Sequence, residues 1–514
     1  MKTALRKHLP QLILVVAATW LLVQLAVGAG LFFKHIWAAI RFPFALDYGE
    51  GPLLDQTIHL AHLGNIYRRD VATPPYTISN YPPVFLLVQV PLAWLFGPAL
   101  WYGRAINLLS LIAATISIGL IIYTTTDDLI AAIVAGLTLL PFPFIVHWSA
   151  FNRIDSLALG ISCAGLYAVV RWGHTRRGLI WGAALLTASV YTRQSYALAA
   201  PLAAFMWLLR PGDDALPRRR AFELAAWVAG MGLGVFLLLN LITWGGFYFN
   251  IVAANVNPFY WHTVREYAGE VWKNIPYLLV AGALFLLAGL LFAPARLLFA
   301  PARLWSGKKL APRSWWVVAP YLVGATASAI TIGKSGSNVN YLFEFCAALS
   351  LVVGAWIAWP KRWPLLQAAL MLALVPQVAG IARWTREGRF TWIMGKIAER
   401  DEIAQMTELA HAADGPVLAD EYMALVPLAG KPLYFQPFEL KQLYLAGTWD
   451  ESAFLQDIQD QKFPLLLIYD PPWWNSQKER WTPQQLFYIS LYYEESDRLA
   501  NTIIYRPKSF VLGD

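Results

Sequence analysis

Cysteine is almost absent from this chain: its 514 residues include only Cys163 and Cys346, and both lie inside apolar runs. A disulfide framework and a CxxC metal knuckle are therefore excluded. Charged residues are also scarce, at 14%, against roughly 25% in ordinary soluble domains. Together with an apolar content of 58%, this scarcity is typical of a polytopic membrane protein.

The net charge of +8 does not indicate a nucleic-acid-binding protein. The Lys and Arg residues stand in short clusters between apolar runs, where they orient a membrane protein instead of forming one basic face. The first apolar run is longer than the roughly 7–15 residues of a signal-peptide core, so we expect an uncleaved transmembrane helix. We therefore expect the lipid bilayer as a partner of this chain and no nucleic acid.

Eleven apolar segments are long enough to cross roughly 30 Å of hydrocarbon. They are residues 11–33, 103–123, 128–147, 154–172, 178–192, 195–209, 221–244, 274–295, 314–332, 341–359 and 364–383. The sequence therefore predicts a transmembrane domain over residues 1–383.

A twelfth apolar segment, "YPPVFLLVQVPLAWLFG", is short and contains three prolines. If it does not span, the clusters of Lys and Arg all fall on the side of the N-terminus, as the positive-inside rule requires. We therefore predict a re-entrant or interface-lying helix at 82–97, within a first extracytoplasmic loop at 34–102. This topology places the N-terminus in the cytoplasm of a plasma or inner membrane protein.

The composition of the sequence changes near residue 384, where polar and charged residues become frequent among the apolar ones. "IAQMTELAHAA" is typical of an amphipathic helix, whereas "GPVLAD" and "FPLLLIYD" are typical of buried strands. We predict a small extracytoplasmic α/β domain at 384–514. The duplicated "LLFAPARLLFAPARLW" predicts a basic amphipathic helix at the cytoplasmic interface.

The stretch "LDYGEGPLLDQ" follows the first span and carries three acids, Asp47, Glu50 and Asp55. Asp55 is interpreted as a solvated acid in the first turns of a surface helix beginning near Gly51. Asp47 and Glu50 are more promising, because they flank Gly49 in a turn where the backbone can approach a ligand closely.

The other outer loops gather further polar groups. They contribute His147, Asn152, Arg153 and Asp155, then Arg193 and Gln194, then His262 and Arg265, and finally Lys334, Asn338, Asn340 and Glu344. Ionisable residues at membrane depth are costly and are usually functional or paired. Glu344 is the clearest example; its alternative role is a structural ion pair with an Arg of a neighbouring helix such as Arg104.

Carboxylates and cations on one face of a membrane protein suit glycosyl transfer from a lipid-linked sugar phosphate. A carboxylate can take the proton of an acceptor hydroxyl, while Arg and Lys stabilise the charge that grows on a phosphate leaving group. Such a donor would place its phosphate at the level of the lipid headgroups.

The order of several motifs resembles the GT-C superfamily of membrane glycosyltransferases, which use polyprenyl-phosphate sugars. The motifs are the acids of "DYGE", the helix end "LAHLGNIY", the "YPP" helix closing with "WLFGP", then "GRAINLL", "RIDSLAL" and "TRQS". The nearest branch holds protein O-mannosyltransferases and the lipid A aminoarabinose transferase. The resemblance covers residues 10–345 and implies an all-α polytopic domain, to which the C-terminal α/β domain is appended.

The resemblance implies roles for particular residues. The catalytic base falls on Asp47 or Glu50, and the second acidic position falls on Asp155. Tyr81 replaces a Lys or His that is common in the family, so Arg193 and Lys334 become the candidates for the phosphate. The full predicted substrate-binding set is Tyr81, Arg104, Arg153, Arg193, His262, Arg265, Lys334, Asn338, Asn340 and Glu344.

A divalent cation, Mg²⁺ or Mn²⁺, is a further option for the site. Asp47, Glu50, Asp155, His59 and His62 offer ligands of the right kind. Members of the superfamily differ in their need for metal, and the sequence supplies no third ligand beside the two histidines, which share a helix face at i, i+3. No metal or other cofactor is therefore assigned.

The leading hypothesis is an inverting glycosyltransferase that moves a sugar from a polyprenyl-phosphate donor to a hydroxyl of a lipid, glycan or protein at the outer face. One alternative is a transporter or flippase, which would predict inverted repeats and broken helices near the midplane. Another is a non-catalytic scaffold whose aromatic C-terminal domain, with "PPWWNSQKERW", binds partners or sugars.

Overall fold

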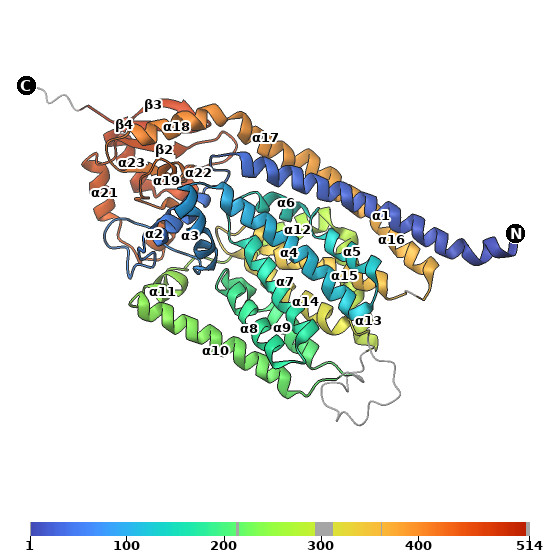
Figure 1. The fold of residues 1–514 in the computed structure, drawn as a ribbon. Coiled ribbons are helices and arrows are strands. Elements are labelled where there is room, and N and C mark those ends of the chain that lie inside the picture. The colour runs from blue at the N-terminus through green and yellow to red at the C-terminus, as the bar shows by residue number, and fades with distance from the viewer. Residues whose placement is uncertain (1, 212–214, 293–311, 361, 510–514) are drawn as a thin grey trace, which may run out of the picture.

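The structure is a computed structural model that describes residues 2–211, 215–292, 312–360 and 362–509. Most of the "LLFAPARLLFAPARLW" segment, predicted as a basic interface helix, lies outside the described residues. The described chain forms a long helical bundle with a small mixed domain at one end (Figure 1).

The bundle is built from the apolar runs, because a helix satisfies its own backbone hydrogen bonds where water is absent. Its helices are α1 (Lys2–Arg41), α4 (Trp101–Thr126), α5 (Leu129–Thr138), α6 (Pro143–Ser149), α7 (Asp155–Trp172), α8 (Arg176–Val190), α9 (Ala199–Leu208), α10 (Arg219–Ile242), α13 (Pro276–Phe292), α14 (Trp315–Ile330), α15 (Phe343–Ala358) and α16 (Pro364–Trp384). Helix α15 lies at the centre and is buried along most of its length.

Every one of the eleven predicted spans coincides with a helix or a bent pair of helices, but not all are full crossings. In the described residues, six helices are long and apolar enough to cross a membrane, or up to eight if two bent pairs each form one span. Helices α8 and α9 have 15 and 10 residues. At 1.5 Å per residue these reach only about 22 and 15 Å, short of the roughly 30 Å of a bilayer core. By length and composition alone, the described residues thus hold fewer full-length candidate spans than the eleven predicted apolar segments.

Short helices connect the spans at the end that carries the mixed domain. Helix α3 (Val84–Phe96) has 13 residues and ends at Gly97, whose φ is 72°. Its length corresponds to about 20 Å, which agrees with the prediction that this apolar segment does not span. The other connecting helices are α2 (Glu50–Ala61), η1 (Gln194–Ala197), α11 (Gly246–Tyr248), η2 (Phe249–Ala253), α12 (Trp261–Asn274), η5 (Thr331–Gly333) and η6 (Val339–Leu342).

The C-terminal domain contains a four-stranded sheet in the order β1-β2-β4-β3. The predicted strands are confirmed: β1 (Val417–Ala419) pairs in parallel with β2 (Leu465–Tyr469), which is buried throughout. Strand β4 (Thr502–Pro507) runs antiparallel to both β2 and β3 (Tyr493–Leu499). Helix α16 continues through η7 (Thr385–Arg389) and α17 (Phe390–Ala398), which lies alongside α1 (Figure 1). The domain's helices are α18 (Arg400–Ala412), α19 (Leu425–Leu428), α20 (Pro437–Leu445), α21 (Ser452–Gln459), α22 (Ser476–Arg480) and α23 (Pro483–Tyr492).

The C-terminal domain packs against α2 and the loop that follows it, at the opposite end of the bundle from the N-terminus (Figure 1). Tyr76 forms a β-bridge with Phe435. The Leu433 N–H donates to Asp55 Oδ1 across 3.0 Å, and Asp55 is buried. The interpretation of Asp55 as a solvated surface acid is therefore wrong, because the C-terminal domain covers this face of α2.

Candidate functional site

Glu50 is completely enclosed at the start of α2. Its Oε1 accepts from Arg104 Nε at 2.9 Å and from the Asn152 N–H at 2.5 Å. Its Oε2 accepts from Arg104 Nη2 at 2.8 Å and from the Leu46 N–H at 2.7 Å. Both oxygens are thus fully engaged, and the carboxylate ties three separate segments of the chain together.

Arg104 has the same enclosed character on the first turn of α4. Besides binding Glu50, its guanidinium donates to the carbonyl oxygens of Ala39, Phe42 and Phe44 at the end of α1. Its side chain has no exposed surface. Arg104 is therefore the partner of Glu50, and the suggested pairing of Arg104 with Glu344 is wrong.

Asp47 is only three residues from Glu50 but lies in a different environment. Its Oδ2 accepts from the Gly49 N–H at 3.0 Å and lies 2.6 Å from Arg153 Nη2. Burial raises the pKa of Asp47 to about 6; Arg153 opposes the rise, and Glu421 and Glu50 add to it. The described hydrogen bond and ion pair of the Asp47 carboxylate both use Oδ2.

Asp155 begins α7 and anchors a second buried cluster. Its Oδ2 accepts from Trp148 Nε1 at 2.6 Å, and its Oδ1 accepts from Asn340 Nδ2 at 3.1 Å and pairs with Arg193 Nη1. Arg193 also donates to the Asn340 carbonyl and lies 4.2 Å from the centre of the Tyr341 ring. Loops that are distant in sequence therefore meet here.

Glu344 lies in the first turn of α15 and is buried. The guanidinium that acts on it electrostatically is Arg193. Its Oε1 has no hydrogen-bond partner among the described residues. Glu344 thus belongs to the Arg193 cluster.

Tyr81 lies between the two clusters. Its hydroxyl is within electrostatic reach of Arg153 on one side and of Asp155 and Arg193 on the other, and burial raises its pKa to about 12. Predicted acids and cations from two outer loops therefore act on one tyrosine.

The remaining predicted residues differ in their burial and in their contacts. Lys334 is half buried, which lowers its pKa, and its Nζ lies 2.5 Å from Asn255 Oδ1; Tyr341 interacts with it electrostatically. Asn338 accepts from the Val339 N–H and so caps η6. His262 and Arg265 lie on the exposed face of α12, and among the described contacts neither reaches the Asp47 or Asp155 cluster.

Comparison with known proteins bears on the fold of the chain. No family model matches the chain, and no curated protein matches it. Among solved structures, ArnT from Cupriavidus metallidurans in the apo state matches with a TM-score of 0.60 and 15% identity, over 97% of this chain and 100% of that chain. The same protein bound to undecaprenyl phosphate gives 0.58 and 15%, over 96% and 99%. The chain has the GT-C fold.

A second GT-C structure is also similar. The archaeal oligosaccharyltransferase AglB from Archaeoglobus fulgidus, in complex with an inhibitory peptide and a dolichol-phosphate, matches with a TM-score of 0.52 and 12% identity. The match covers 99% of this chain and 75% of AglB. The fold predicted from the sequence, a polytopic helical domain with a small C-terminal domain, is confirmed.

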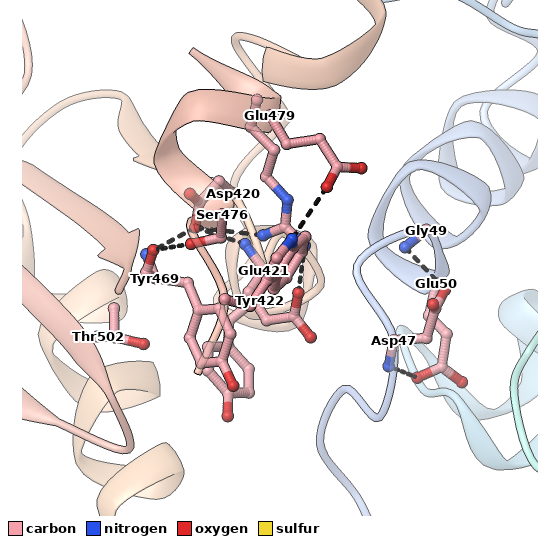
Figure 2. A network of polar contacts seen from close by, with 12 residues as sticks. Asp47, Gly49, Glu50, Asp420, Glu421, Tyr422, Tyr469, Ser476, Glu479 and Thr502 are labelled. Atoms are coloured by element: carbon pink, nitrogen blue, oxygen red, sulfur yellow. Dashed lines mark hydrogen bonds and ion pairs between the residues drawn. The ribbon is translucent and has the colours of Figure 1, made fainter. Parts of the chain in front are cut away.

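The C-terminal domain contributes residues to this candidate site that the sequence did not identify. Arg480 of α22 pairs with Glu421 and lies 3.7 Å from Asp420. Figure 2 shows these two acids, Asp420 and Glu421, beside each other in the C-terminal domain. The Arg480 guanidinium also lies 5.1 Å from the centre of the Tyr48 ring, whereas Arg153 lies 5.3 Å from the same ring. Tyr48 therefore links one arginine of the bundle to one of the C-terminal domain. The adjacent acids of "LADEY", directly after a predicted strand, were the available signal.

The described residues contain no group of three or more His, Cys, Asp or Glu side chains arranged to hold a metal ion. His59 Nδ1 lies 3.5 Å from Asp55 Oδ2, and His62 Nδ1 lies 2.8 Å from the Ile58 carbonyl oxygen. Both histidines are thus engaged on their own helix. A divalent cation at this site stays an open expectation.

Proposed function

We propose that this protein is an inverting glycosyltransferase that moves a sugar from a polyprenyl-phosphate donor to an acceptor hydroxyl, with Asp47 as the base. The observation that supports this assignment is the contrast between the two acids of the first loop. Glu50 has both oxygens engaged, whereas Asp47 is paired on one oxygen at the junction of the helical bundle and the C-terminal domain. Similar structures have been captured with undecaprenyl phosphate and with dolichol-phosphate.

The reaction is a single displacement at the anomeric carbon of the sugar. Asp47 accepts the proton of the acceptor hydroxyl while that oxygen bonds to the anomeric carbon from the face opposite the phosphate. The bond between the anomeric carbon and the phosphate oxygen breaks, and its electron pair leaves with the polyprenyl phosphate. One displacement inverts the configuration of that carbon.

The cations around Tyr81 have distinct roles in this scheme. Arg153 orients Asp47 and holds it ionised, because a nearby positive charge favours the carboxylate. Lys334 and Arg193 face the departing phosphate. Arg193 is already balanced by Asp155, so the half-buried Lys334 supplies the less compensated charge. Preorganised cations of this kind stabilise the charge that develops in the transition state.

We infer that the site faces away from the cytoplasm. Six helices suited to crossing a membrane support an integral membrane protein, and the cation clusters predict a cytoplasmic N-terminus. The site and the C-terminal domain lie at the other end of the bundle (Figure 1). The acceptor, a lipid, glycan or protein, then approaches from the aqueous side and the donor from the outer leaflet.

The experiment is a donor-cleavage assay on the purified full chain in lipid vesicles. Undecaprenyl-phosphate-linked mannose, glucose and aminoarabinose are supplied with a membrane extract of the source organism, and released undecaprenyl phosphate is measured by mass spectrometry. We expect release with at least one donor, and loss of release in Asp47→Asn. Release that persists undiminished in Asp47→Asn refutes the assignment of the base. A wild-type protein that binds these lipids and cleaves none favours a flippase.

A further inference from the structure

A small cavity of about 30 Å³ lies beside the Asp47–Arg153 pair. Its wall comes from four places: Gln56 on α2, Tyr81 in the loop before α3, Arg153 in the loop before α7, and Glu439 on the first turn of α20. The C-terminal domain thus closes the cavity that the helical bundle begins.

Three polar atoms of this wall are buried without a hydrogen-bond partner among the described residues. They are Gln56 Oε1, Glu439 Oε2 and Arg153 Nε. A buried polar atom that lacks a partner costs roughly 1–3 kcal/mol, so three around one cavity are unusual for packing alone. Two of them accept hydrogen bonds and one donates.

The wall residues are held in place by bonds that do not use these three atoms. Gln56 Nε2 donates to the Ile78 carbonyl oxygen across 3.3 Å. The start of α20 is tied to the same segment, because the Ile78 N–H donates to Gln436 Oε1 and the Gln436 N–H donates to the Tyr76 carbonyl oxygen. Arg153 is fixed by Asp47 through Nη2. The unpartnered atoms are therefore preorganised.

We propose that Gln56, Glu439 and Arg153 form a subsite that binds one hydroxyl or amino group of the substrate. The inference rests on the proposed glycosyltransferase function and adds a specificity-determining role for the C-terminal domain. The size of the cavity fits a single polar group and excludes a sugar ring. Two acceptors and one donor match a hydroxyl, which both donates and accepts. A protonated amine would use the two acceptors and gain from the charge of Glu439.

The group can belong to the transferred sugar or to the acceptor, and two assays of the full chain in vesicles distinguish them. The first measures slow hydrolysis of undecaprenyl-phosphate-linked sugars by water, without an acceptor. The second measures transfer in the presence of the membrane extract. Glu439→Ala and Gln56→Ala are compared with wild type and with Glu494→Gln, a control that removes an exposed acid of β3.

We expect Glu439→Ala to lower transfer about 10- to 100-fold, the effect of losing a hydrogen bond to a charged group. Hydrolysis that falls equally assigns the subsite to the donor sugar; hydrolysis within twofold of wild type assigns it to the acceptor. Glu439→Gln retains an accepting oxygen, so near-normal transfer indicates a hydroxyl and a loss like that of Ala indicates an amine.

Transfer and hydrolysis that both stay within twofold of wild type in Glu439→Ala and Gln56→Ala overturn the subsite. Equal losses accompanied by a fall of the thermal midpoint relative to Glu494→Gln also overturn it, because they indicate a structural role. A wild-type chain that cleaves none of the donors fails the proposed function itself, and the subsite falls with it.

Discussion

Two acids three residues apart, Asp47 and Glu50, each form an ion pair with an arginine. The two pairs differ in their exposure and in the number of contacts that each carboxylate makes. Glu50 and Arg104 show no exposed side-chain surface, and they bind each other through two hydrogen bonds. Asp47 and Arg153 retain 14% and 8% exposure and line the junction between the bundle and the C-terminal domain. A saturated carboxylate cannot accept another proton donor without losing an existing bond, so the pair with the incomplete set of contacts is the one suited to substrate.

The comparison also separates stability from catalysis. Removing one member of a buried pair leaves the other charge uncompensated in a medium of low dielectric constant. Removing the less enclosed acid leaves Arg153 beside the Tyr48 and Trp148 rings, which can still stabilise a cation. The two pairs should therefore respond differently to mutation.

The largest effect is expected from Asp47→Asn. The amide keeps the shape of the side chain but cannot accept the proton, so transfer should fall about 100- to 10,000-fold. Release of undecaprenyl phosphate in vesicles measures the loss, and the thermal midpoint should match wild type. A variant that loses its fold together with its activity would contradict the distinction drawn between the pairs.

Glu50→Ala should lower stability, because it removes one member of the enclosed pair. It leaves Arg104 buried without its counter-charge, at a cost of roughly 3–5 kcal/mol in the free energy of unfolding. We expect a much lower thermal midpoint and a reduced yield of monodisperse protein in detergent. The double variant Glu50→Ala with Arg104→Met should recover part of the stability, and a double variant as unstable as the single one would argue against the pair.

Gly49→Ala tests whether the close approach of Arg153 to the loop matters. A Cβ at Gly49 would overlap the Arg153 guanidinium, although the backbone φ of −80° is permitted for alanine. Transfer should fall about 10-fold, as expected when a positioned group is displaced. The matched control is Gly269→Ala on α12, where an added Cβ meets open space.

Tyr48→Leu should weaken the link between the two arginines that flank the ring. Each cation–π contact is worth about 0.5–2 kcal/mol, so the free energy of unfolding should fall by about 1–2 kcal/mol and transfer by less than in Gly49→Ala. Thermal unfolding and transfer measured together test this. An unchanged midpoint would mean that Tyr48 does not join the C-terminal domain to the bundle.

The smallest effect concerns pH. Burial raises the pKa of Asp47 to about 6 while Arg153 lowers it, so activity that needs the carboxylate should be lost as the pH falls through about 6. Arg153→Gln removes the lowering influence, and the acidic limb should move to higher pH by about one unit. The pH profile of hydrolysis measures the shift. Arg498→Gln, which alters an exposed pair with Asp470, should leave the limb in place.

The placement of elements along the chain followed closely from the sequence. The apolar runs became helices, the short "YPP" segment became a helix too short to span, and "FPLLLIYD" became the buried strand β2. These outcomes depend on local hydrophobicity and periodicity, which a sequence displays directly. Two of the helices built from these runs, α8 and α9, have only 15 and 10 residues.

The sequence identified most residues of the site, but it did not show which of them contact one another. Asp47, Arg153, Asp155, Arg193 and Asn340 were identified from their loops, and the structure brings them together around Tyr81. His262 and Arg265 were included with equal reason and lie on an exposed helix. Loop position says which end of the membrane a residue occupies, and it does not say which direction its side chain faces.

The sequence by itself determined that this protein is a membrane helical bundle with a small C-terminal domain that contains a sheet, because burial of apolar runs depends on residues close together in the chain. Only the tertiary structure decided that Glu50 is enclosed by Arg104 while Asp47 is not, and that Glu439 and Arg480 of the C-terminal domain reach the site of the first loop. Desolvation and ion pairing depend on distances in space. Those distances are set by packing between segments that lie far apart in the chain, and this packing cannot be deduced from the sequence alone.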